Sequence, residues 1–139
     1  MNLDDKSLLG MAKAARSQAY APYSGYRVGA ALEAENGTIF TGCNVENASY
    51  GATCCAERTA IFKAVSEGIR RIKRIAIAGG TDEGLNYAYP CGICRQVLRE
   101  FCDPDELKII VGTSDSDIKT YTLAELLPDS FGPDFKNTP

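Results

Sequence analysis

The sequence predicts an α/β fold, in which a mixed five-stranded sheet forms the middle layer of a three-layer α/β/α sandwich. Strand-like stretches flank helical stretches at residues 54–67 and 91–102, which is typical of helices packed on a partly parallel sheet. The last two strands are separated only by a turn at 114–117, and a connection that short makes them antiparallel. At 139 residues we expect one domain, 1–139, with an irregular tail from about residue 129.

The first half of the chain is expected to form a helix, a strand hairpin, a loop and a second helix. These elements cover residues 4–19, 27–34 with 38–45, 46–53 and 54–67, in that order. Both helices place apolar side chains on one face at helical spacing. Asn36 and Gly37 between the strands are the strongest short-range signal for a hairpin, and Gly68 is typical of the residue after a helix end.

The second half is expected to form a strand, a helix, two more strands and a short helix. These elements cover residues 72–78, 91–102, 107–111, 118–122 and 123–127. Gly79 and Gly80 are expected to close the first of these strands, and Pro104 to stop the helix before it. The predicted order along the chain is therefore α-β-β-α-β-α-β-β-α.

The composition excludes several kinds of chemistry and partner. The chain has 6 Cys but no His, which rules out Ser-His-Asp and Cys-His catalysis and any metal site built on His. Lys and Arg number 15 against 18 Asp and Glu, and the basic run Arg70–Arg74 is expected to be a solvated connection between a helix and a strand. This charge pattern argues against a nucleic-acid polymer as partner. No run approaches the roughly 20 apolar residues of a membrane span.

The N-terminal residues bear on the compartment and hence on the cysteines. Met1–Asp5 is acidic and lacks the apolar segment of a secretory signal peptide, so we expect a cytoplasmic protein. Cysteines in that compartment are more often metal ligands or free thiols than disulfides. The cysteines are therefore the first candidates for a functional site.

Two short cysteine motifs carry the chemistry. Cys55 is followed directly by Ala56 and Glu57, while Cys91 and Cys94 form a C-x-x-C pair at the expected start of a helix. A C-x-x-C pair alone fits either a zinc site or a redox motif, whereas a third cysteine with a Glu beside it favours zinc. Three protein ligands leave the fourth tetrahedral position open for water, which distinguishes a catalytic zinc site from a closed structural one.

A zinc site made only of thiolates needs compensation for its negative charge. Three thiolates outweigh one Zn²⁺, and the surplus negative charge weakens the metal as a Lewis acid. All three candidate ligands lie at expected helix N-termini, where the helix dipole acts like roughly half a positive charge. Arg58 is close enough in sequence to donate hydrogen bonds to the ligand sulfurs. Glu57 is the best candidate for the general acid–base group, since no His competes for the role.

Other interpretations of these cysteines are buried free thiols or a closed structural zinc site. Cys43, Cys54 and Cys102 are expected to be ordinary buried or half-buried residues, because free Cys behaves as a small hydrophobic residue. Cys55 rather than Cys54 is the expected ligand because it directly precedes the Ala-Glu pair.

With these motifs the sequence resembles the cytidine deaminase family from about Ala19 to Phe131. Three further segments are similar to the family's substrate-covering segment, its ribose-binding strand end and its C-terminal segment, namely 23–32, 43–48, and 125–128 with 131–133. The likeness is to the small, homotetrameric, three-Cys class that acts on free nucleosides. It implies a cytidine deaminase-like fold, one Zn²⁺ per chain held by Cys55, Cys91 and Cys94, and hydrolytic deamination of cytidine and 2′-deoxycytidine in pyrimidine salvage.

The resemblance also implies how the chain would handle its substrate. Glu57 would shuttle protons, Asn44 and Glu46 would hydrogen-bond the ribose hydroxyls, and the backbone at Ala56 would contact the amide edge of the base. Tyr26 stands where the family usually has Phe packed against the base, and its hydroxyl needs a polar partner or water. From the residues alone, Asn44 and Glu46 would instead be a solvated strand end.

The same resemblance implies a homotetramer whose active sites are shared between subunits. Ala48, Tyr50 and Phe131 would reach a neighbouring subunit's site, and the Phe131 ring would stack on the pyrimidine. From the residues alone, Phe131 would be a tail residue that docks on the core of its own subunit.

Three rival functions share part of this pattern. A deaminase of another aminopyrimidine nucleoside, such as blasticidin S, needs the cysteine motifs but not Glu46. A polynucleotide editor is disfavoured by the acidic net charge and by the antiparallel final strand. A zinc module used only for assembly needs a fourth protein ligand and has no use for Glu57.

Overall fold

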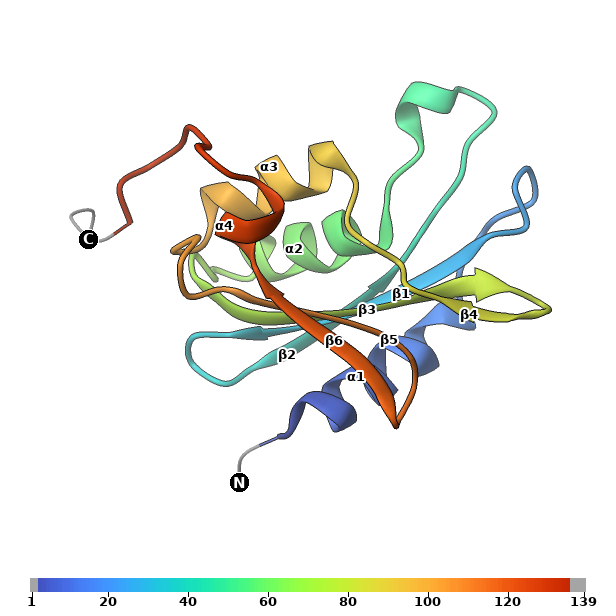
Figure 1. Cartoon of the computed structure of the whole chain (residues 1–139). Coiled ribbons are helices and arrows are strands. Elements are labelled where there is room, and N and C mark those ends of the chain that lie inside the picture. Colours follow the sequence, from blue (N-terminus) through green and yellow to red (C-terminus); the bar gives the residue numbers. More distant parts are fainter. Residues whose placement is uncertain (1–2, 136–139) are drawn as a thin grey trace.

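The computed structural model of the chain describes residues 3–135, and its core is a mixed sheet between two layers of helices (Figure 1). The strands are β1 (Arg27–Ala34), β2 (Ile39–Cys43), β3 (Ile72–Thr81), β4 (Gly84–Asn86), β5 (Lys108–Ser114) and β6 (Asp117–Thr122). The helices are α1 (Asp5–Arg16), α2 (Ala56–Ser66), α3 (Gly92–Glu100) and α4 (Leu123–Leu126), with a 3-10 turn η1 at Tyr50–Ala52.

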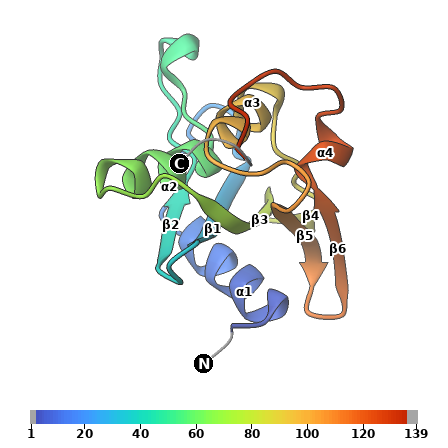
Figure 2. The same ribbon diagram turned by 90° about the vertical axis from the view of Figure 1, so that its left-hand side faces the viewer.

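The sheet has the strand order β2-β1-β3-β5-β6, and β4 pairs with β3 off this path. Only β3 and β5 run parallel; the other pairs, including β5 with β6, are antiparallel. The predicted mixed sheet and its antiparallel final pair are therefore confirmed. Helix α1 covers one face of the sheet, and α2 and α3 cover the other (Figures 1 and 2).

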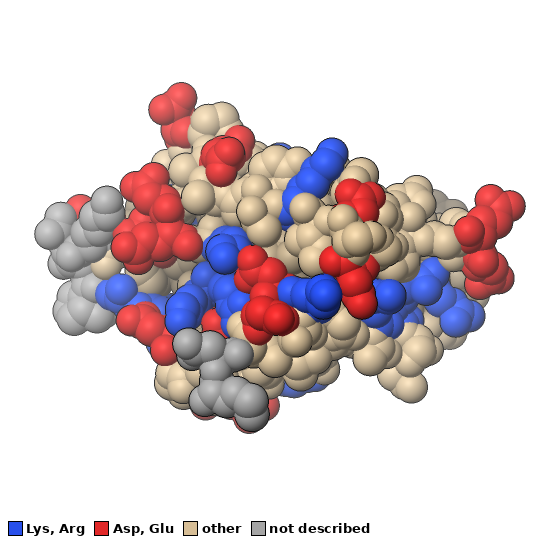
Figure 3. Space-filling view, turned by 60° about the horizontal axis from the view of Figure 1, so that its bottom comes forward, with Lys and Arg blue, Asp and Glu red and all other residues tan. Residues whose placement is uncertain are grey.

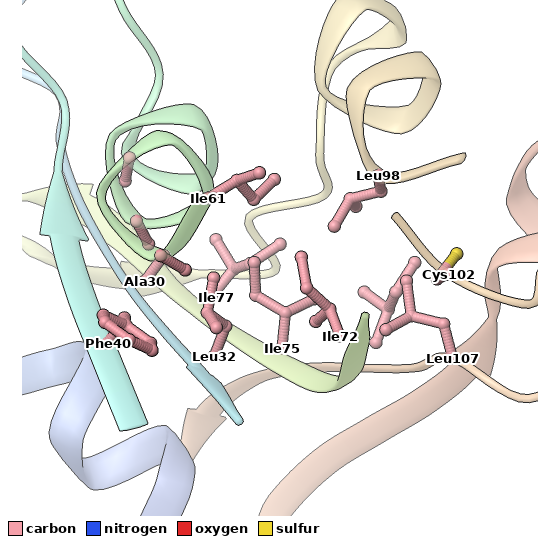
Figure 4. Close-up of a cluster of buried hydrophobic side chains, with 14 of the residues drawn as sticks. Ala30, Leu32, Phe40, Ile61, Ile72, Ile75, Ile77, Leu98, Cys102 and Leu107 are labelled. Carbon is pink, nitrogen blue, oxygen red and sulfur yellow. The ribbon is translucent and has the colours of Figure 1, made fainter. Parts of the chain in front are cut away.

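Alternation along β3 divides the core between these two faces. Ile75 and Ile77 point toward α2 and α3, where they pack with Ile61 and Leu98 (Figure 4). The small side chains of Ala76 and Ala78, which alternate with these isoleucines along the strand, face α1. Each fully buried isoleucine contributes roughly 1.5–3 kcal/mol by leaving water. The smaller alanine side chains leave space for α1 to lie close to the sheet, while the bulkier face supports the two helices that carry the cysteines.

A sixth, short strand, β4, was not predicted from the sequence. Gly79 and Gly80 were expected to end the strand at Ala78, but β3 continues through them to Thr81 and turns back into β4. A side chain on Gly80 would place its Cβ 2.0 Å from the backbone oxygen of Gly84, so the hairpin closes only over glycine. At Gly79 a Cβ would lie 3.2 Å from the Tyr26 ring. The two glycines thus permit close packing and do not mark a strand end.

Helices α1, α2 and α3 are shorter than predicted at both ends, and α4 ends one residue early, which matters for the cysteines. Helix α2 begins at Ala56 with Cys55 as its N-cap, and α3 begins at Gly92 with Cys91 as its N-cap. Both N-cap residues have extended backbone, so their side chains lie just ahead of the free N–H groups of the first helical turn. The predicted placement of the candidate ligands at helix N-termini is confirmed.

Opposite charges are interspersed on the face that carries the N-terminal end of the chain (Figure 3). Arg74 was expected to be part of a solvated connection, but its side chain is only 11% exposed and pairs with Glu33 at 2.7 Å and Asp5 at 2.9 Å. Asp5 also pairs with Lys108 at 3.0 Å. Strand β3 includes this arginine, so it is an ion-paired sheet residue.

The tail is irregular from 129 to 135, as predicted, while 136–139 and the first two residues of the acidic N-terminus lie outside the described residues. Among helices within 3–135, none has the length and apolar character that a membrane crossing requires.

Candidate active site

The three cysteines chosen from the sequence come together where the N-termini of α2 and α3 meet. The sulfur atoms of Cys55, Cys91 and Cys94 all lie within 4.8 Å of one another, and those of Cys55 and Cys91 are 3.6 Å apart. Zinc–sulfur bonds of about 2.3 Å in tetrahedral geometry put neighbouring sulfurs roughly 3.8 Å apart. All three thiols are free, so donor set and spacing both fit zinc.

The site favours a thiolate at Cys55. Hydrogen bonds from the side chains of Cys94 and Arg58 lower the pKa of Cys55 to about 5, against the effect of burial. The same contact with Cys55, together with burial, raises the pKa of Cys94. Without a cation, negative charge therefore collects on Cys55 while Cys94 keeps its proton. A divalent cation would remove that competition, because it stabilises all three thiolates.

Arg58 faces the cluster, as the sequence predicted. One of its terminal nitrogens lies 3.5 Å from the Cys55 sulfur and 3.4 Å from the backbone oxygen of Thr53. Its Nε is buried and has no hydrogen-bond partner among the described residues. The guanidinium thus offers positive charge and hydrogen-bond donors to the ligand sulfurs.

Glu57 brings an almost fully buried carboxylic acid to the three-thiol cluster, with 3% of its surface exposed. Burial raises the pKa of its carboxyl group to about 7. A carboxyl group in that range can both accept and return a proton at neutral pH. Zinc bound at the thiols would favour the carboxylate and so act against the effect of burial.

A cavity of about 300 Å³ opens in front of this cluster. This volume is at the lower end of the roughly 300–1,000 Å³ range for small-molecule sites. The lining residues include Cys55, Cys91 and Glu57 at one end, and Tyr26, Asn44, Glu46 and Ala56 among the rest. The structure therefore brings four of the seven predicted substrate residues to the cavity.

The other three, Ala48, Tyr50 and Phe131, do not line this cavity within residues 3–135. All three are exposed, Tyr50 at 79% and Phe131 at 80%. The expectation that Phe131 docks on its own core is wrong for its ring. The expectation that these residues serve a neighbouring subunit stays a prediction.

Asn44 is held in one orientation by the backbone around it. Its side-chain oxygen accepts a hydrogen bond of 2.8 Å from the Val28 N–H, and its side-chain nitrogen donates one of 2.9 Å to the Tyr26 carbonyl. The residue is only 8% exposed, so the alternative of a solvated strand end is wrong for Asn44. One N–H of its amide is left over for a ligand.

Glu46 holds Tyr23 and Ser24 by hydrogen bonds, and Ser24 is part of the cavity wall. One carboxylate oxygen accepts hydrogen bonds from the N–H groups of Tyr23 at 2.9 Å and Ser24 at 3.1 Å, and the other accepts one from the Ser24 hydroxyl. These bonds, the Ser24 hydroxyl first, lower the pKa of Glu46. The Ser24 oxygen also accepts from the Tyr26 N–H at 3.0 Å. Ser24 therefore joins the acidic side chain to the aromatic wall of the cavity.

Sequence reasoning missed several residues of the cavity wall. Ser24 belongs to segment 23–32, which the resemblance singles out only as a whole, and the sequence assigns no role to Tyr87 and Tyr89, although all three line the cavity. The Tyr87 hydroxyl donates to Asp117, and the hydroxyls of Tyr89 and Tyr121 lie 3.2 Å apart. Only the position of the two tyrosines just before the second cysteine motif could have pointed to the cavity. Cys54 also lines the cavity, although it was expected to be an ordinary residue.

Comparison with known proteins agrees with this geometry. The family model for the cytidine and deoxycytidylate deaminase zinc-binding region matches residues 3–111. A cytidine deaminase of Sporosarcina psychrophila is 48% identical over 129 residues, which is 93% of this chain and 92% of the relative. The chain belongs to the cytidine deaminase family.

Other members of the family show the same likeness. A cytidine deaminase of Mycobacterium tuberculosis is 42% identical over 133 residues, covering 96% of this chain and 93% of the relative. The crystal structure of a cytidine deaminase from Burkholderia pseudomallei superimposes with a TM-score of 0.84 at 45% identity, over 93% of this chain and 100% of the other. Membership of the family confirms the predicted fold and makes the chain an enzyme with zinc as its cofactor, which removes the alternative of a zinc module used only for assembly. The matched region includes the three cysteines and Glu57, whereas Phe131 lies beyond it.

Proposed function

We propose that this enzyme deaminates cytidine and 2′-deoxycytidine hydrolytically, to uridine and 2′-deoxyuridine plus ammonia. The observation that carries the proposal is the buried Glu57 carboxyl at the three-thiol cluster, at one end of a cavity that has Asn44 and Glu46 elsewhere in its wall. The names of the relatives support the choice of cytidine. The proposed setting is pyrimidine salvage in the cytoplasm, with residues 1–139 acting as one domain.

Cys55, Cys91 and Cys94 would hold one Zn²⁺ per chain. When bound, zinc lowers the pKa of a coordinated water and so supplies a nucleophile at neutral pH. The chain offsets the surplus charge of three thiolates in two ways. Arg58 donates to the sulfur of Cys55, and the N-termini of α2 and α3 direct their free N–H groups and dipoles at the cluster.

Glu57 would move each proton of the reaction. It removes a proton from the attacking water and delivers it to N3 of the base as the new C4–O bond forms. It then takes the second proton from that oxygen and gives it to the amino group, so that the C4–N bond breaks and ammonia leaves. Burial of Glu57 keeps bulk water away from this shuttle and holds its pKa near the range in which both transfers are efficient.

The rest of the cavity would bind and orient the nucleoside. Asn44 offers its remaining N–H, and Glu46 its carboxylate, to the ribose hydroxyls. The N–H of Ala56, in the first turn of α2, has no partner within the helix and is free for the amide edge of the base. The Tyr26 ring would pack against the base.

The exposed residues Ala48, Tyr50 and Phe131 support a shared active site in a homotetramer. Large aromatic side chains that are about four-fifths exposed, such as those of Tyr50 and Phe131, are typical of anchors that a partner covers. We propose that they complete the cavity of a neighbouring copy, with Phe131 stacked on the pyrimidine.

An ultraviolet assay with purified protein tests the proposed function. We expect loss of the cytidine absorbance with release of ammonia, similar turnover of 2′-deoxycytidine, and close to one zinc ion per chain. Blasticidin S is the comparison substrate. Turnover of blasticidin S without turnover of cytidine would contradict the proposal, and so would full turnover by protein from which zinc has been removed.

A further inference from the structure

The C-terminal tail lies along α3 and is held there by a buried arginine. Arg99 is only 9% exposed; its Nε donates to the Ser130 hydroxyl at 2.9 Å and its Nη1 to the Pro133 carbonyl at 2.8 Å. Hydrogen bonds from a charged group are stronger than neutral ones, and a buried cation that loses them is left unpaired. Arg99 therefore fixes the tail on both sides of residues 131–132.

Two neighbouring side chains of α3 hold the same tail. Gln96 donates from its side-chain nitrogen to the Phe131 carbonyl at 3.1 Å. Arg95 donates to the Leu126 carbonyl at 2.6 Å, where the tail leaves α4. The backbone of the tail is thus bonded to α3 before, at and after Phe131.

Gly132 shows how closely the tail approaches this arginine. A Cβ on Gly132 would lie 3.0–3.1 Å from the Cγ, Nη1 and Cζ atoms of Arg99. The φ angle of Gly132 is +157°, at the edge of the range that favours glycine. Replacing Gly132 would therefore disturb the same contact from the side of the tail.

The backbone of Phe131 is held firmly, but its ring is left largely uncovered by its own subunit. It is 80% exposed and does not line the cavity that the described residues form. A fixed backbone that presents an exposed aromatic ring is the arrangement of a preorganised anchor, because a ring that is already ordered loses little entropy on docking. The hydrogen bonds from α3 therefore hold in place a ring that is free to be covered by another molecule.

We propose that Arg99 and Gln96 are positioning residues for the reaction, which set Phe131 in place for the cavity of a neighbouring copy of the chain. The inference rests on the proposed function, in which Phe131 stacks on a substrate held by another subunit. In this arrangement Arg99 acts on the neighbour's active site and leaves the site of its own subunit intact. The alternative is that Arg99 acts through α3 on Cys91 and Cys94 of its own subunit.

The first test compares Arg99→Ala with Glu100→Ala, an exposed residue of the same helix, in the zinc-loaded oligomer. Misplacing a substrate-binding group by about 1 Å costs up to roughly a hundredfold in efficiency. We expect Arg99→Ala to raise the KM for cytidine by at least tenfold, with normal zinc content, and Arg99→Lys to recover part of the loss. Glu100→Ala should behave as the unaltered enzyme. An unchanged KM in Arg99→Ala would overturn the inference.

The decisive test mixes two defective chains. Glu57→Gln lacks the proton shuttle but has an intact tail, whereas Arg99→Ala has the shuttle but a loosened tail. Co-expressed with different affinity tags and purified as mixed oligomers, they would form some sites from Glu57 of one chain and Phe131 of the other. We expect these oligomers to show turnover with the low KM of the unaltered enzyme. Mixed oligomers with only the high KM of Arg99→Ala would show that Arg99 acts within its own subunit.

Two further measurements keep the outcomes separate. If Arg99→Ala does not fold, Gln96→Ala and Gly132→Ala replace it in both tests, since each disturbs the same contacts. The unaltered enzyme is assayed alongside, with its oligomeric state determined by analytical ultracentrifugation. Absent cytidine turnover there would defeat the proposed function itself. Normal turnover by a monomer, or unchanged kinetics in Phe131→Ala, would leave the proposed deamination intact and would defeat both the shared site and the inference about positioning.

Discussion

The cavity has two parts that are built in different ways: the three-thiol cluster with Glu57, called the metal end, and the region of Ser24 and Glu46, called the sugar end after its proposed role. At the metal end, Cys55 and Glu57 lie within one turn at the start of α2, and Cys91 and Cys94 within one turn at the start of α3. At the sugar end, the acidic side chain of Glu46 depends on Ser24, 22 residues earlier in the chain. Reactive geometry thus comes from short motifs on rigid helix ends, whereas recognition geometry comes from hydrogen bonds between separate loops.

We therefore expect substitutions at the two ends to affect different kinetic constants. Changes at the metal end should remove chemistry while leaving substrate binding, since they act on the reacting atoms. Changes to side chains at the sugar end should mainly weaken binding, since those side chains do not act on the reacting atoms and the backbone bonds between Val45 and Cys54 would remain.

The largest expected effect is that of Glu57→Gln. The amide cannot accept and return the proton, so kcat should fall by roughly 10²–10⁴-fold. Zinc content should stay the same, because the residue is not a thiol ligand and the replacement is similar in size. Steady-state kinetics with metal analysis of the same sample checks this. Undiminished deamination by the variant would refute the role of Glu57.

Removal of zinc should come next in size. Zinc would bind the folded cluster and not the unfolded chain, so chelation should abolish turnover and lower the thermal stability of the region in which α2 and α3 meet. Adding back zinc should restore both properties. Activity assays and thermal melts before and after dialysis against a chelator measure the effect, with buffer-dialysed protein as the control. Full activity of zinc-free protein would show that the metal end does not carry the chemistry.

Arg58→Ala should have a smaller effect at the same end. Loss of its hydrogen bond to the Cys55 sulfur removes the positive charge that offsets the thiolates. Partners of metal ligands typically contribute roughly 10–100-fold to metal affinity or activity, and we expect a loss of that size. Competition with a zinc chelator and turnover measurements check it, with the exposed cation Lys73→Ala as the control. If zinc affinity and turnover both matched the unaltered enzyme, Arg58 would have no such role.

Ser24→Ala should be milder and of a different kind. It removes one hydrogen bond to a charged group that is open to solvent, so the KM for cytidine should rise by about tenfold or less, with kcat nearly unchanged. Ser24→Thr keeps the hydroxyl and is the matched control. Kinetics on the two variants distinguish the ends of the cavity: a fall in kcat alone would mean that the loops also set the geometry of the helix ends.

The smallest expected effect is that of Tyr26→Phe, which keeps the ring and removes only the hydroxyl. We expect kinetic constants within about threefold of the unaltered enzyme, because packing of the ring against the base would be retained. Tyr26→Ala, which removes the ring, should raise KM much more. Comparing the two variants on cytidine separates the contribution of the ring from that of the hydroxyl.

Prediction from sequence succeeded best where the signal was local. The C-x-x-C pair, the Cys-Ala-Glu run and the Asn36-Gly37 turn each lie within a few residues, and the structure places all of them as expected. It failed where a residue type has two uses. Gly79 and Gly80 end many strands, but here they allow β4 and the Tyr26 ring to approach β3. Arg74 lies in a basic run, but pairing with Glu33 and Asp5 takes it out of solvent.

The sequence by itself determined the chemistry of this protein: six cysteines, no histidine, and a glutamate two residues after a cysteine permit a thiolate metal site with a single proton shuttle. Those properties follow from residue identity and from spacing within one helical turn. Tertiary structure decided the recognition surface, from the bond between Ser24 and Glu46 to the tail held by Arg99, because these contacts join segments more than 20 residues apart. No local periodicity encodes such pairs; they exist only once the sheet has brought the loops and α3 into place.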